Sequence, residues 1–531
     1  MKRRSTREKS RFDVDIKAPA FWVCTFYLLI GLIGSWRVGA YADSPADALL
    51  AKYNFGLLFG LSDLTANYAL DSDVYVASYG YSVALFVFGP IWFVGKLFDP
   101  NISLQSENAI FLRNFLSYSI GMLGILALYK WGKIVLKPGL QFLPLLLPIL
   151  TPTLFGNFFM NSKDIPLFTG FSSLMYLIAL LFDKVETIKV KSTEIVFWVF
   201  VSVVFTFGVR PISIAWLIPI FAVIIIFVFK QKDTYLRPIF IGLCISIAYT
   251  WITNYYLLTN PLFWISNLLN TGKDFPWTGA VLSWGKLYRA PEIPGSYLSE
   301  MLFAQIPLFV ILIIPVYIFR IRSKSKNNKS KLPFSVIASF ALSLFVILQT
   351  LVLKPVIYDN GRQLLFVWGL LALVLMWLIN ESYSTIKKFK SIATVLACLT
   401  IVATIDQIKL FPYNYVYRNE IAQKLPAGSF ETDYWGLSGK ELARWVVKDS
   451  SLSNIPNAKF AYIFQQSYDP FLKKSGLELV SINDLGTKYY SQIWRPGLLP
   501  DYSAQCPIAY SVERSFLLGK KEVLGYVRKC E

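Results

Sequence analysis

Carboxylates, basic side chains and amides occur together in four short stretches that interrupt long apolar runs. These stretches are YADSPADALL at 41–50, FMNSKDIPLF at 159–168, GVRP at 208–211 and LKPVIYDNGRQLLF at 353–366. The candidate catalytic residues are Asp43, Asp47 and Asp164, and the candidate substrate-binding residues are Asn161, Lys163, Arg210, Lys354, Tyr358, Asp359, Arg362 and Gln363. Cations can stabilise a phosphate leaving group while a carboxylate accepts a proton from an attacking hydroxyl. These residue types therefore suit group transfer from a lipid phosphate to a hydroxyl.

Histidine does not occur anywhere in the sequence. Imidazole is the usual general base near neutral pH and the commonest metal ligand, so a Ser-His-Asp triad and a histidine-based zinc site are excluded. Proton transfer must fall to carboxylates, tyrosines or lysines, and any metal would be a hard cation such as Mg²⁺ or Mn²⁺ on oxygen ligands. Because no cluster of ligands requires a metal, we predict no certain cofactor and leave a divalent cation open.

Each of these charges also has a structural interpretation. A charge at the end of an apolar run is most often an interfacial anchor or a helix cap, and Asp164 before Ile165 and Pro166 fits an N-terminal cap. The charged pairs Asp71 with Asp73 and Lys273 with Asp274 are further candidates of this kind. Together the charges favour a functional site, because charged groups at membrane depth are costly and tend to mark function.

The elements that must position these residues are membrane spans. Hydrophobic residues make up 55% of the 531 residues and charged residues only 16%, and apolar runs long enough to cross a bilayer follow one another along the chain. The sequence therefore predicts a polytopic α-helical membrane protein. The net charge of +19 comes from lysines and arginines in short loops beside the runs, which indicates topology and not a nucleic-acid partner.

Basic loops stay on the cytoplasmic side, which orients the spans and places the basic start of the chain in the cytoplasm. About eleven spans follow, at 18–39, 108–129, 140–158, 165–182, 193–209, 212–229, 238–257, 298–319, 333–353, 363–380 and 391–409. Segment 80–98 contains Gly89 and Pro90 and is expected to be a re-entrant or interfacial helix, because a crossing there would put later basic loops outside. All candidate site residues then lie on the outer side.

The expected domains follow from this topology. Residues 1–17 form a basic cytoplasmic N-terminus, 18–411 a transmembrane domain with its first periplasmic loop at 40–107, and 412–531 a small periplasmic α/β domain. That domain has β-like runs at 458–464, 477–482, 506–514 and 522–527, and one helix whose start from Ser438 to Glu441 has capping-box spacing. Cys506 and Cys530 could pair if the domain lies outside the cytoplasm, which the sequence leaves open.

These stretches also carry a resemblance to a known family. TPTLFGNFFMNSKDIPLF resembles the Asn-x-Lys-Asp-x-Pro region of bacterial membrane glycosyltransferases of family 39, which belong to the GT-C superfamily with protein O-mannosyltransferases and the aminoarabinose transferase of lipid A. Four further regions of the sequence resemble the same subgroup and follow one another along the chain in the family's order. They are RNFLSYSIGMLGILALY, TGKDFPWTGAVLSWGKLY, KPVIYDNGRQLLFVWG, and FPYNYVYRNEIAQ with ETDYWGLSGKELARW. The resemblance implies a GT-C fold and an inverting glycosyltransferase in the bacterial inner membrane, with a polyprenyl-phosphate-linked sugar donor.

The resemblance also implies roles for single residues. Asp43, or Asp47 nearby, resembles the general base, and Asp164 resembles a second essential acid. Arg362 resembles the cation that meets the lipid-linked phosphate. Two positions depart from the family pattern: Gln363 replaces a histidine, and Ser44 and Pro45 interrupt an Asp-Glu pair. The implied partners are the lipid-linked sugar, membrane lipid, and a glycan, lipid or protein acceptor.

Two other functions stay open. A lipid or sugar transporter would carry charges at mid-depth and a repeat between its halves, whereas these charges gather at outer span ends and no repeat is evident. A non-catalytic GT-C-like scaffold of a cell-envelope polysaccharide system is the other alternative, and the absence of the family's histidine adds to its weight. The sugar, the acceptor and the length of the carrier lipid do not follow from the sequence.

Overall fold

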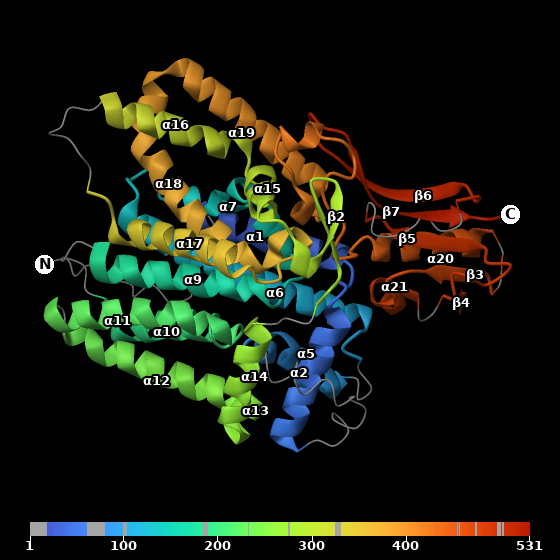
Figure 1. Cartoon of the computed structure of the whole chain (residues 1–531), viewed down its shortest axis with the longest axis horizontal. Coiled ribbons are helices and arrows are strands. Elements are labelled where there is room, and N and C mark those ends of the chain that lie inside the picture. The colour runs from blue at the N-terminus through green and yellow to red at the C-terminus, as the bar shows by residue number, and fades with distance from the viewer. Residues whose placement is uncertain are drawn as a thin grey trace, which may run out of the picture.

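The computed structural model consists of a helical bundle with a β-sheet at one of its ends (Figure 1). It describes residues 19–60, 80–98, 103–183, 190–231, 233–273, 277–323, 331–453, 455, 457–472, 475–495, 501 and 504–531. The candidates Asp71, Asp73 and Asp274 lie outside these residues. Helices such as α6 (Glu107–Val135), α9 (Asp164–Ile178) and α17 (Phe334–Leu353) run along the long axis of the molecule in Figure 1, with the sheet at the right-hand end near the C-terminus.

Six helical segments in the described part of the chain are long and apolar enough to cross a membrane. They are Glu107–Val135 (α6), Asp164–Asp183 (α9 with η3), Pro211–Lys230 (η4 with most of α11), Phe334–Leu353 (α17), Asp359–Lys388 (η8 with α18) and Lys390–Leu410 (α19). Shorter apolar helices are Trp22–Arg37 in α1, Ala84–Phe93 in α5, Ser192–Val204 (α10) and Leu236–Ile252 (α12). The chain is thus a polytopic α-helical membrane protein, as predicted.

Two predicted spans are not single helices. Segment 140–158 is divided into η1 (Leu143–Leu146), α7 (Leu147–Leu150), α8 (Pro152–Gly156) and η2 (Asn157–Phe159). Segment 298–319 is divided into α15 (Ser296–Gln305) and α16 (Leu308–Ser323), which are bent by 94° and would make a seventh span if they cross together. Proline explains both breaks, because it lacks the N–H that continues a helix and clashes with the preceding turn. The total of about eleven spans stays a prediction.

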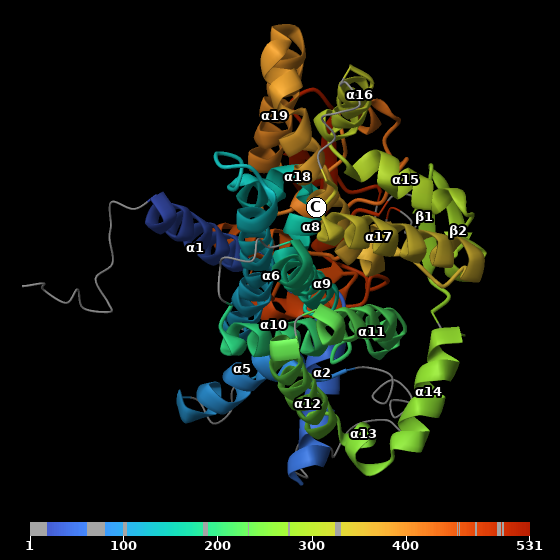
Figure 2. The same cartoon turned by 90° about the vertical axis from the view of Figure 1, so that its left-hand side faces the viewer.

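Helix α9 (Asp164–Ile178) lies at the centre of the bundle (Figure 2). Figure 2 looks along the bundle and shows α9 beside α6, with α10, α17 and α18 around this pair. Its span is 94% buried. Phe168 of α9 packs onto Gly124 and Gly369, where an added Cβ would lie 2.5 Å and 2.4 Å from the ring. Small residues at such contacts let membrane helices approach closely, and this packing fixes the N-terminus of α9.

Span ends that were predicted to be cytoplasmic lie together at the end of the bundle away from the sheet. Lys130 near the end of α6 forms an ion pair of 2.6 Å with Glu194 at the start of α10. Arg320 of α16 pairs with Glu381 of α18. These contacts agree with the relative directions of the predicted spans, while the side of the membrane stays a prediction.

The C-terminal sheet has the strand order β4-β3-β5-β7-β6. Its elements are α20 (Gly439–Leu452), β3 (Lys459–Tyr462), α21 (Gln465–Leu472), β4 (Glu478–Val480), β5 (Tyr489–Ile493), β6 (Ile508–Ser515) and β7 (Lys521–Lys529). Strands β4, β3 and β5 are parallel, and β5, β7 and β6 are antiparallel. The four predicted β-like runs correspond to β3, β4, β6 and β7, whereas β5 and α21 were not predicted.

The predicted capping box at the start of α20 is wrong. The side chain of Ser438 makes no capping hydrogen bond and donates instead to the Leu524 carbonyl. Glu441 accepts from Arg514 at 2.7 Å and from the Tyr413 hydroxyl at 2.9 Å. Both side chains are used in packing α20 onto the sheet and onto the chain that leaves α19, and this tertiary packing overrides the local pattern.

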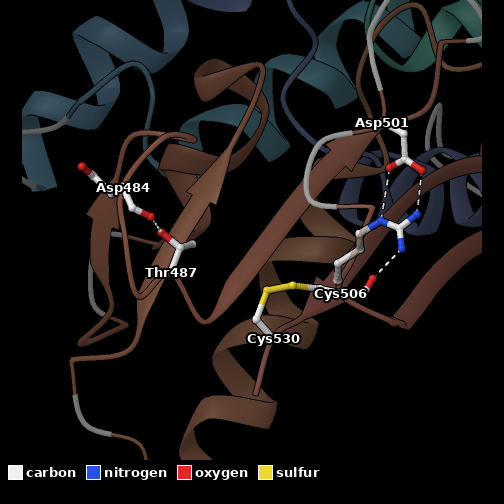
Figure 3. Close-up of a disulfide and its surroundings, with 6 residues drawn as sticks. Asp484, Thr487, Asp501, Cys506 and Cys530 are labelled. Carbon is white, nitrogen blue, oxygen red and sulfur yellow. Dashed lines mark hydrogen bonds and ion pairs between the residues drawn. A yellow bond between two sulfur atoms is a disulfide. The ribbon is translucent and has the colours of Figure 1, made fainter.

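Cys506 and Cys530 form a disulfide beside the last strand (Figure 3). Near it, Arg528 pairs with Asp501 at 2.7 Å and donates to the Cys506 carbonyl at 2.6 Å. The pairing that the sequence left open is therefore present. Disulfides persist in oxidising compartments, which favours the predicted location of this region outside the cytoplasm.

Several short elements lie at the end of the bundle that faces the sheet. They are α2 (Ser44–Phe59), α5 (Ala84–Phe98), α13 (Tyr255–Thr259), α14 (Pro261–Lys273), the hairpin β1 (Ala280–Ser283) with β2 (Lys286–Arg289), and η8 (Asp359–Leu364). Helix α5 packs against α2 and α6. Its expected re-entrant or interfacial position stays a prediction.

Candidate functional site

Asp43 and Arg362 form an ion pair across 319 residues of sequence. The Arg362 Nη2 group donates to Asp43 Oδ2 at 2.9 Å. Asp43 directly precedes α2, but its side chain makes no capping hydrogen bond. The Asp43 side chain is 37% exposed, whereas that of Arg362 is 5% exposed. In this ion pair, an accessible carboxylate thus contacts a buried cation.

Three carboxylates and two aromatic rings surround the Arg362 guanidinium. Its Nε lies 3.2 Å from Asp359 Oδ2 and its Nη1 lies 4.0 Å from Asp164 Oδ2. Its Cζ lies 5.0 Å from the ring centroid of Tyr358 and 4.3 Å from that of Trp435. A buried charge needs such partners, because the loss of its hydration is costly. The predicted residues Asp43, Asp164, Tyr358, Asp359 and Arg362 therefore meet at one point.

The backbone of η8 explains how Asp359 and Arg362 meet. Three successive residues, Asp359, Asn360 and Gly361, have φ values of 53°, 54° and 63°. Left-handed backbone is unfavourable for residues with a Cβ and is found mainly where function or packing requires it. The tight turn brings the Asp359 carboxylate back to Arg362. Tyr358 enters the same turn and stacks on Trp277 at 3.9 Å.

Asp164 is the first residue of α9, but Asn161 provides the helix cap. The Asn161 Oδ1 atom accepts from the backbone N–H of Asp164 at 2.8 Å and of Lys163 at 3.2 Å. The Asp164 carboxylate is thereby left for other partners. Its Oδ1 accepts from Arg210 Nη2 at 2.7 Å and its Oδ2 from Asn161 Nδ2 at 3.0 Å. The structural interpretation as a cap applies to Asn161 and not to Asp164.

Asp47 lies in a second ion pair, with Lys163. Its Oδ2 also accepts from the Tyr41 hydroxyl at 2.7 Å, and that hydroxyl lies 3.2 Å from Ser162 Oγ. Arg113 of α6 lies with its Cζ 4.6 Å from the centroid of the Tyr41 ring. Asp47 is buried, in contrast to Asp43. Of the two predicted bases, Asp43 is thus the more exposed one.

A third group extends the charge network toward the C-terminal sheet. Arg495 Nη2 lies 3.3 Å from Asp359 Oδ1 and 3.3 Å from Glu431 Oε2. The other oxygen of Glu431 accepts from the Leu282 backbone N–H of β1 at 3.1 Å. Burial raises the pKa of Glu431 to about 7, because Arg495 opposes this effect only in part and the nearby charge of Asp359 adds to it. Arg495 is the cation that pairs with Glu431 among the described residues, and it is shared with Asp359.

The electrostatic environment keeps Asp43 ionised. Burial alone would raise the pKa of its carboxyl, but the positive charges of Arg362, Lys163 and Arg210 outweigh this effect and lower the pKa below its ordinary value of 3.8. An ionised carboxylate can accept a proton. The same cations reduce its strength as a base, so a change in their partners would change its reactivity.

Two predicted substrate-binding residues are not part of this cluster of ion pairs. Lys354 follows α17 as an exposed residue in the left-handed conformation, and within the described ranges it has no ion pair with the cluster. Gln363 follows Arg362, and its Oε1 accepts only a long backbone hydrogen bond from Tyr358, of 3.5 Å. The cations near Asp43 are therefore Arg362, Lys163 and Arg210.

The sequence-based prediction missed five residues of the network: Tyr41, Arg113, Glu431, Trp435 and Arg495. Arg113 had a usable signal, because a lone arginine inside an apolar span tends to mark a site. Tyr41 stands two residues before Asp43, in the stretch already selected. Glu431 and Trp435 lie in the stretch ETDYWGLSGKELARW that resembles the family, but the resemblance gave them no role, and Arg495 had no signal. All three belong to the region expected to be a separate domain.

A small cavity of about 40 Å³ adjoins the site between α2 and α5. Asp47, Ser162 and Lys163 form its polar wall, and the rest is apolar. The lining residues from α2, α5 and the chain around them are Leu50, Ala51, Gly80, Tyr81, Val83, Ala84, Phe88 and Val209. The described residues contain no group of three cysteine or acidic side chains that could hold a metal ion.

Comparisons with known proteins give few matches. No protein-family model and no curated protein matches the chain. Two structures of ArnT from Cupriavidus metallidurans are similar to it over 96% of this chain and 98% of that chain. The ArnT structure bound to undecaprenyl phosphate is 10% identical with a TM-score of 0.48, and the apo structure is 9% identical with a TM-score of 0.45. At these values neither structure assigns a residue or an activity to this chain.

Proposed function

We propose that the protein is an inverting GT-C-type glycosyltransferase that moves a sugar from a polyprenyl-phosphate carrier to an acceptor hydroxyl. The observation that carries the proposal is the ion pair between the accessible carboxylate of Asp43 and the buried Arg362. It provides a base for the acceptor and a cation for the carrier phosphate at one place. The residues around it come from loops that adjoin apolar helices, as a donor with a lipid tail requires.

In the proposed reaction the acceptor oxygen attacks the anomeric carbon of the sugar. The bond from that carbon to the carrier phosphate breaks, and its electron pair stays on the phosphate oxygen. Asp43 accepts the proton of the acceptor hydroxyl. Attack opposite the leaving group inverts the anomeric centre, as in inverting glycoside hydrolysis, with the acceptor hydroxyl in place of water. Arg362, Lys163 and Arg210 stabilise the charge that develops on the phosphate.

Phosphate binding and the Asp43 ion pair compete for Arg362. Asp359 has a second cation in Arg495, and Asp164 has one in Arg210. Asp43 forms its only ion pair among the described residues with Arg362. Asp43 is therefore the carboxylate that an incoming phosphate displaces with the smallest loss of ion-pair stabilisation, because the other two carboxylates are held in place by a second cation. Once it is displaced, it gives up its neutralising partner and lies beside a negative charge, which makes it a stronger base.

The other carboxylates have supporting roles in this proposal. Asp164 and Asp359 hold Arg362 from the buried side and stay in place during the reaction. Asp47 is buried between Tyr41 and Lys163, so it positions Lys163 and does not reach the acceptor. Tyr358 contacts Arg362 and Asn161 acts through Asp164 in this proposal, whereas substrate binding by Lys354 and Gln363, which lie outside the cluster, stays a prediction.

We place the site at the periplasmic face of the bacterial inner membrane. In this arrangement 18–411 is the transferase domain and 412–531 the periplasmic domain, and the disulfide in the latter supports it. A transporter is less well supported, because its charges would lie at mid-depth of the spans. Here Asp164 begins α9, Asp43 precedes α2 and Arg362 precedes α18.

The proposal is tested in a strain that lacks the protein and carries the parent, Asp43→Asn or Asp484→Asn in its place. Asp484 is an exposed turn residue of the sheet domain and serves as the matched control. Mass spectra of envelope glycans, glycolipids and glycoproteins should show one sugar modification that is restored by the parent and by Asp484→Asn but not by Asp43→Asn. An envelope that is identical with and without the parent gene would contradict the proposal.

A further inference from the structure

One short segment of the region expected to be a separate domain contacts the site. All residues of Glu431–Ser438 are buried. The Glu431 carboxylate accepts from the β1 backbone, its carbonyl accepts from the Asn360 side chain at 3.4 Å, and the Trp435 carbonyl accepts from the Ala42 N–H at 2.8 Å. The segment thus joins β1, η8 and the loop before α2. None of these contacts was predicted from the sequence.

Trp435 is the member of this segment that lies closest to the proposed chemistry. Its ring centroid lies 4.3 Å from the Arg362 Cζ, and it meets the Tyr41 ring edge-on at 5.3 Å. Its indole Nε1–H donates to Asn157 Oδ1 at 3.0 Å. One side chain therefore contacts the cation that pairs with Asp43 and the tyrosine that donates to Asp47.

The ring acts on Arg362 in a way that carboxylates cannot. Ion pairs hold the nitrogen atoms of a guanidinium, whereas the Trp435 ring lies against its central carbon and restricts where the whole group can sit. The attraction between cation and ring is largest where water is excluded, and both side chains are buried here. The ring contact holds the guanidinium where its Nη2 group reaches Asp43, and after displacement of Asp43 the same position serves the phosphate.

The backbone around Trp435 is itself held firmly. Asp433 accepts from the N–H groups of Leu437 at 3.0 Å and Ser438 at 2.8 Å, which closes a turn around the tryptophan. Gly436 has φ 72°, and a Cβ there would lie 2.6 Å from Ser467 Oγ. Only glycine fits such a position without strain. The turn thus presents the indole from the sheet side of the molecule.

We propose that Trp435 is a positioning residue of the transfer site, which holds Arg362 in the orientation that serves both Asp43 and the carrier phosphate. This inference rests on the proposed function and adds that the C-terminal region completes the site. It also gives the region beyond α19 a part in donor binding. Trp435 touches neither the sugar nor the acceptor in this role.

The test compares Trp435→Leu, Trp435→Phe and a matched control, Trp445→Leu, in the full-length protein. Trp445 is a half-buried tryptophan of α20 whose ring stacks on Tyr510, so Trp445→Leu makes the same chemical change away from Arg362. The KM for the polyprenyl-phosphate donor should rise about 30-fold in Trp435→Leu, the size expected for losing a desolvated cation–ring contact. Phe keeps the ring face and loses the indole N–H, so Trp435→Phe should recover most of this loss.

A second readout separates positioning from general stability. If Arg362 tilts away from Asp43, the pKa of Asp43 rises, and the acidic limb of kcat/KM should move to higher pH in Trp435→Leu but not in Trp445→Leu. Equal KM values and equal acidic limbs in these two variants would overturn the inference while leaving the proposed function intact. A parent protein that neither binds nor uses the donor would overturn both. If Trp435→Leu does not fold, Trp435→Met decides by the same two readouts, since Met also removes the ring, and an unchanged KM with an unchanged acidic limb in that variant would contradict the role of Trp435.

Discussion

The Arg362 guanidinium donates to Asp43 at 2.9 Å, and this ion pair is the only one in its network whose carboxylate is both accessible and singly paired among the described residues. The other carboxylates around Arg362 are each held by a second cation, Arg210 or Arg495. The arrangement therefore has one contact that can open toward a ligand. The proposed competition between Asp43 and a phosphate follows from this asymmetry.

Substituting Asp43 with Asn should tighten the binding of a polyprenyl phosphate. The substitution removes the charge that competes for Arg362, and a half-exposed ion pair contributes about 0.2–1 kcal/mol, so we expect a gain of about 1.5- to 5-fold. Calorimetric titration of the detergent-purified protein with a short-chain polyprenyl phosphate measures this gain. Asp484→Asn, far from the site in sequence and exposed, should leave the affinity unchanged. Weaker binding by Asp43→Asn would contradict the competition.

The pH dependence of transfer should differ between kcat/KM and kcat. The profile of kcat/KM reports the free protein, in which the cations lower the pKa of Asp43 below 3.8, so its acidic limb should lie at or below that pH. The profile of kcat reports the donor complex, in which phosphate has replaced Asp43 at Arg362 and its pKa is higher. The acidic limb of kcat should therefore lie at higher pH. Coincident limbs would show that donor binding leaves Asp43 paired.

Substitution of Asn161 should mainly lower the stability of the protein, whereas substitution of Asp164 should mainly weaken donor binding. Asn161→Ala removes the cap of α9 and should lower the free energy of unfolding by about 1 kcal/mol. Asp164→Asn keeps that cap but leaves Arg210 and Arg362 with less negative charge, so its main effect should be on donor KM. Thermal unfolding and steady-state transfer, measured on both variants, check this division. Equal loss of stability in the two variants would indicate that the Asp164 side chain also caps α9, which would contradict the assignment of the cap to Asn161.

Glu431 should make stability depend on pH. Its pKa is about 7 in the folded protein against an ordinary 4.5, so between these values the folded state binds more protons than the unfolded state, and stability falls as pH rises. Glu431→Gln lacks this titration. The melting temperature of the variant relative to the parent should therefore rise from about pH 5 to about pH 8. A constant difference across this range would mean that Glu431 is ionised throughout.

The helical bundle could be predicted from the sequence because bilayer thickness fixes the length of each apolar run. The breaks in two predicted spans, at 140–158 and 298–319, were not predicted. Proline interrupts these helices because it lacks the backbone N–H, and a hydropathy pattern does not show this loss. Asp43, Asp164 and Arg362 were found because charge is rare beside such runs. Trp435 and Glu431 were not found, because only tertiary packing shows that their segment returns to the membrane helices.

The central claim is that Asp43 accepts the proton of the acceptor during sugar transfer. The most direct measurement is the rate of transfer from a polyprenyl-phosphate-linked sugar in membranes that contain the parent protein or Asp43→Asn at equal amounts. Loss of a general base lowers a rate by about 10²- to 10⁴-fold, so transfer by the variant should fall by at least about 100-fold while the carrier stays bound. Transfer at the parent rate by Asp43→Asn would contradict the account.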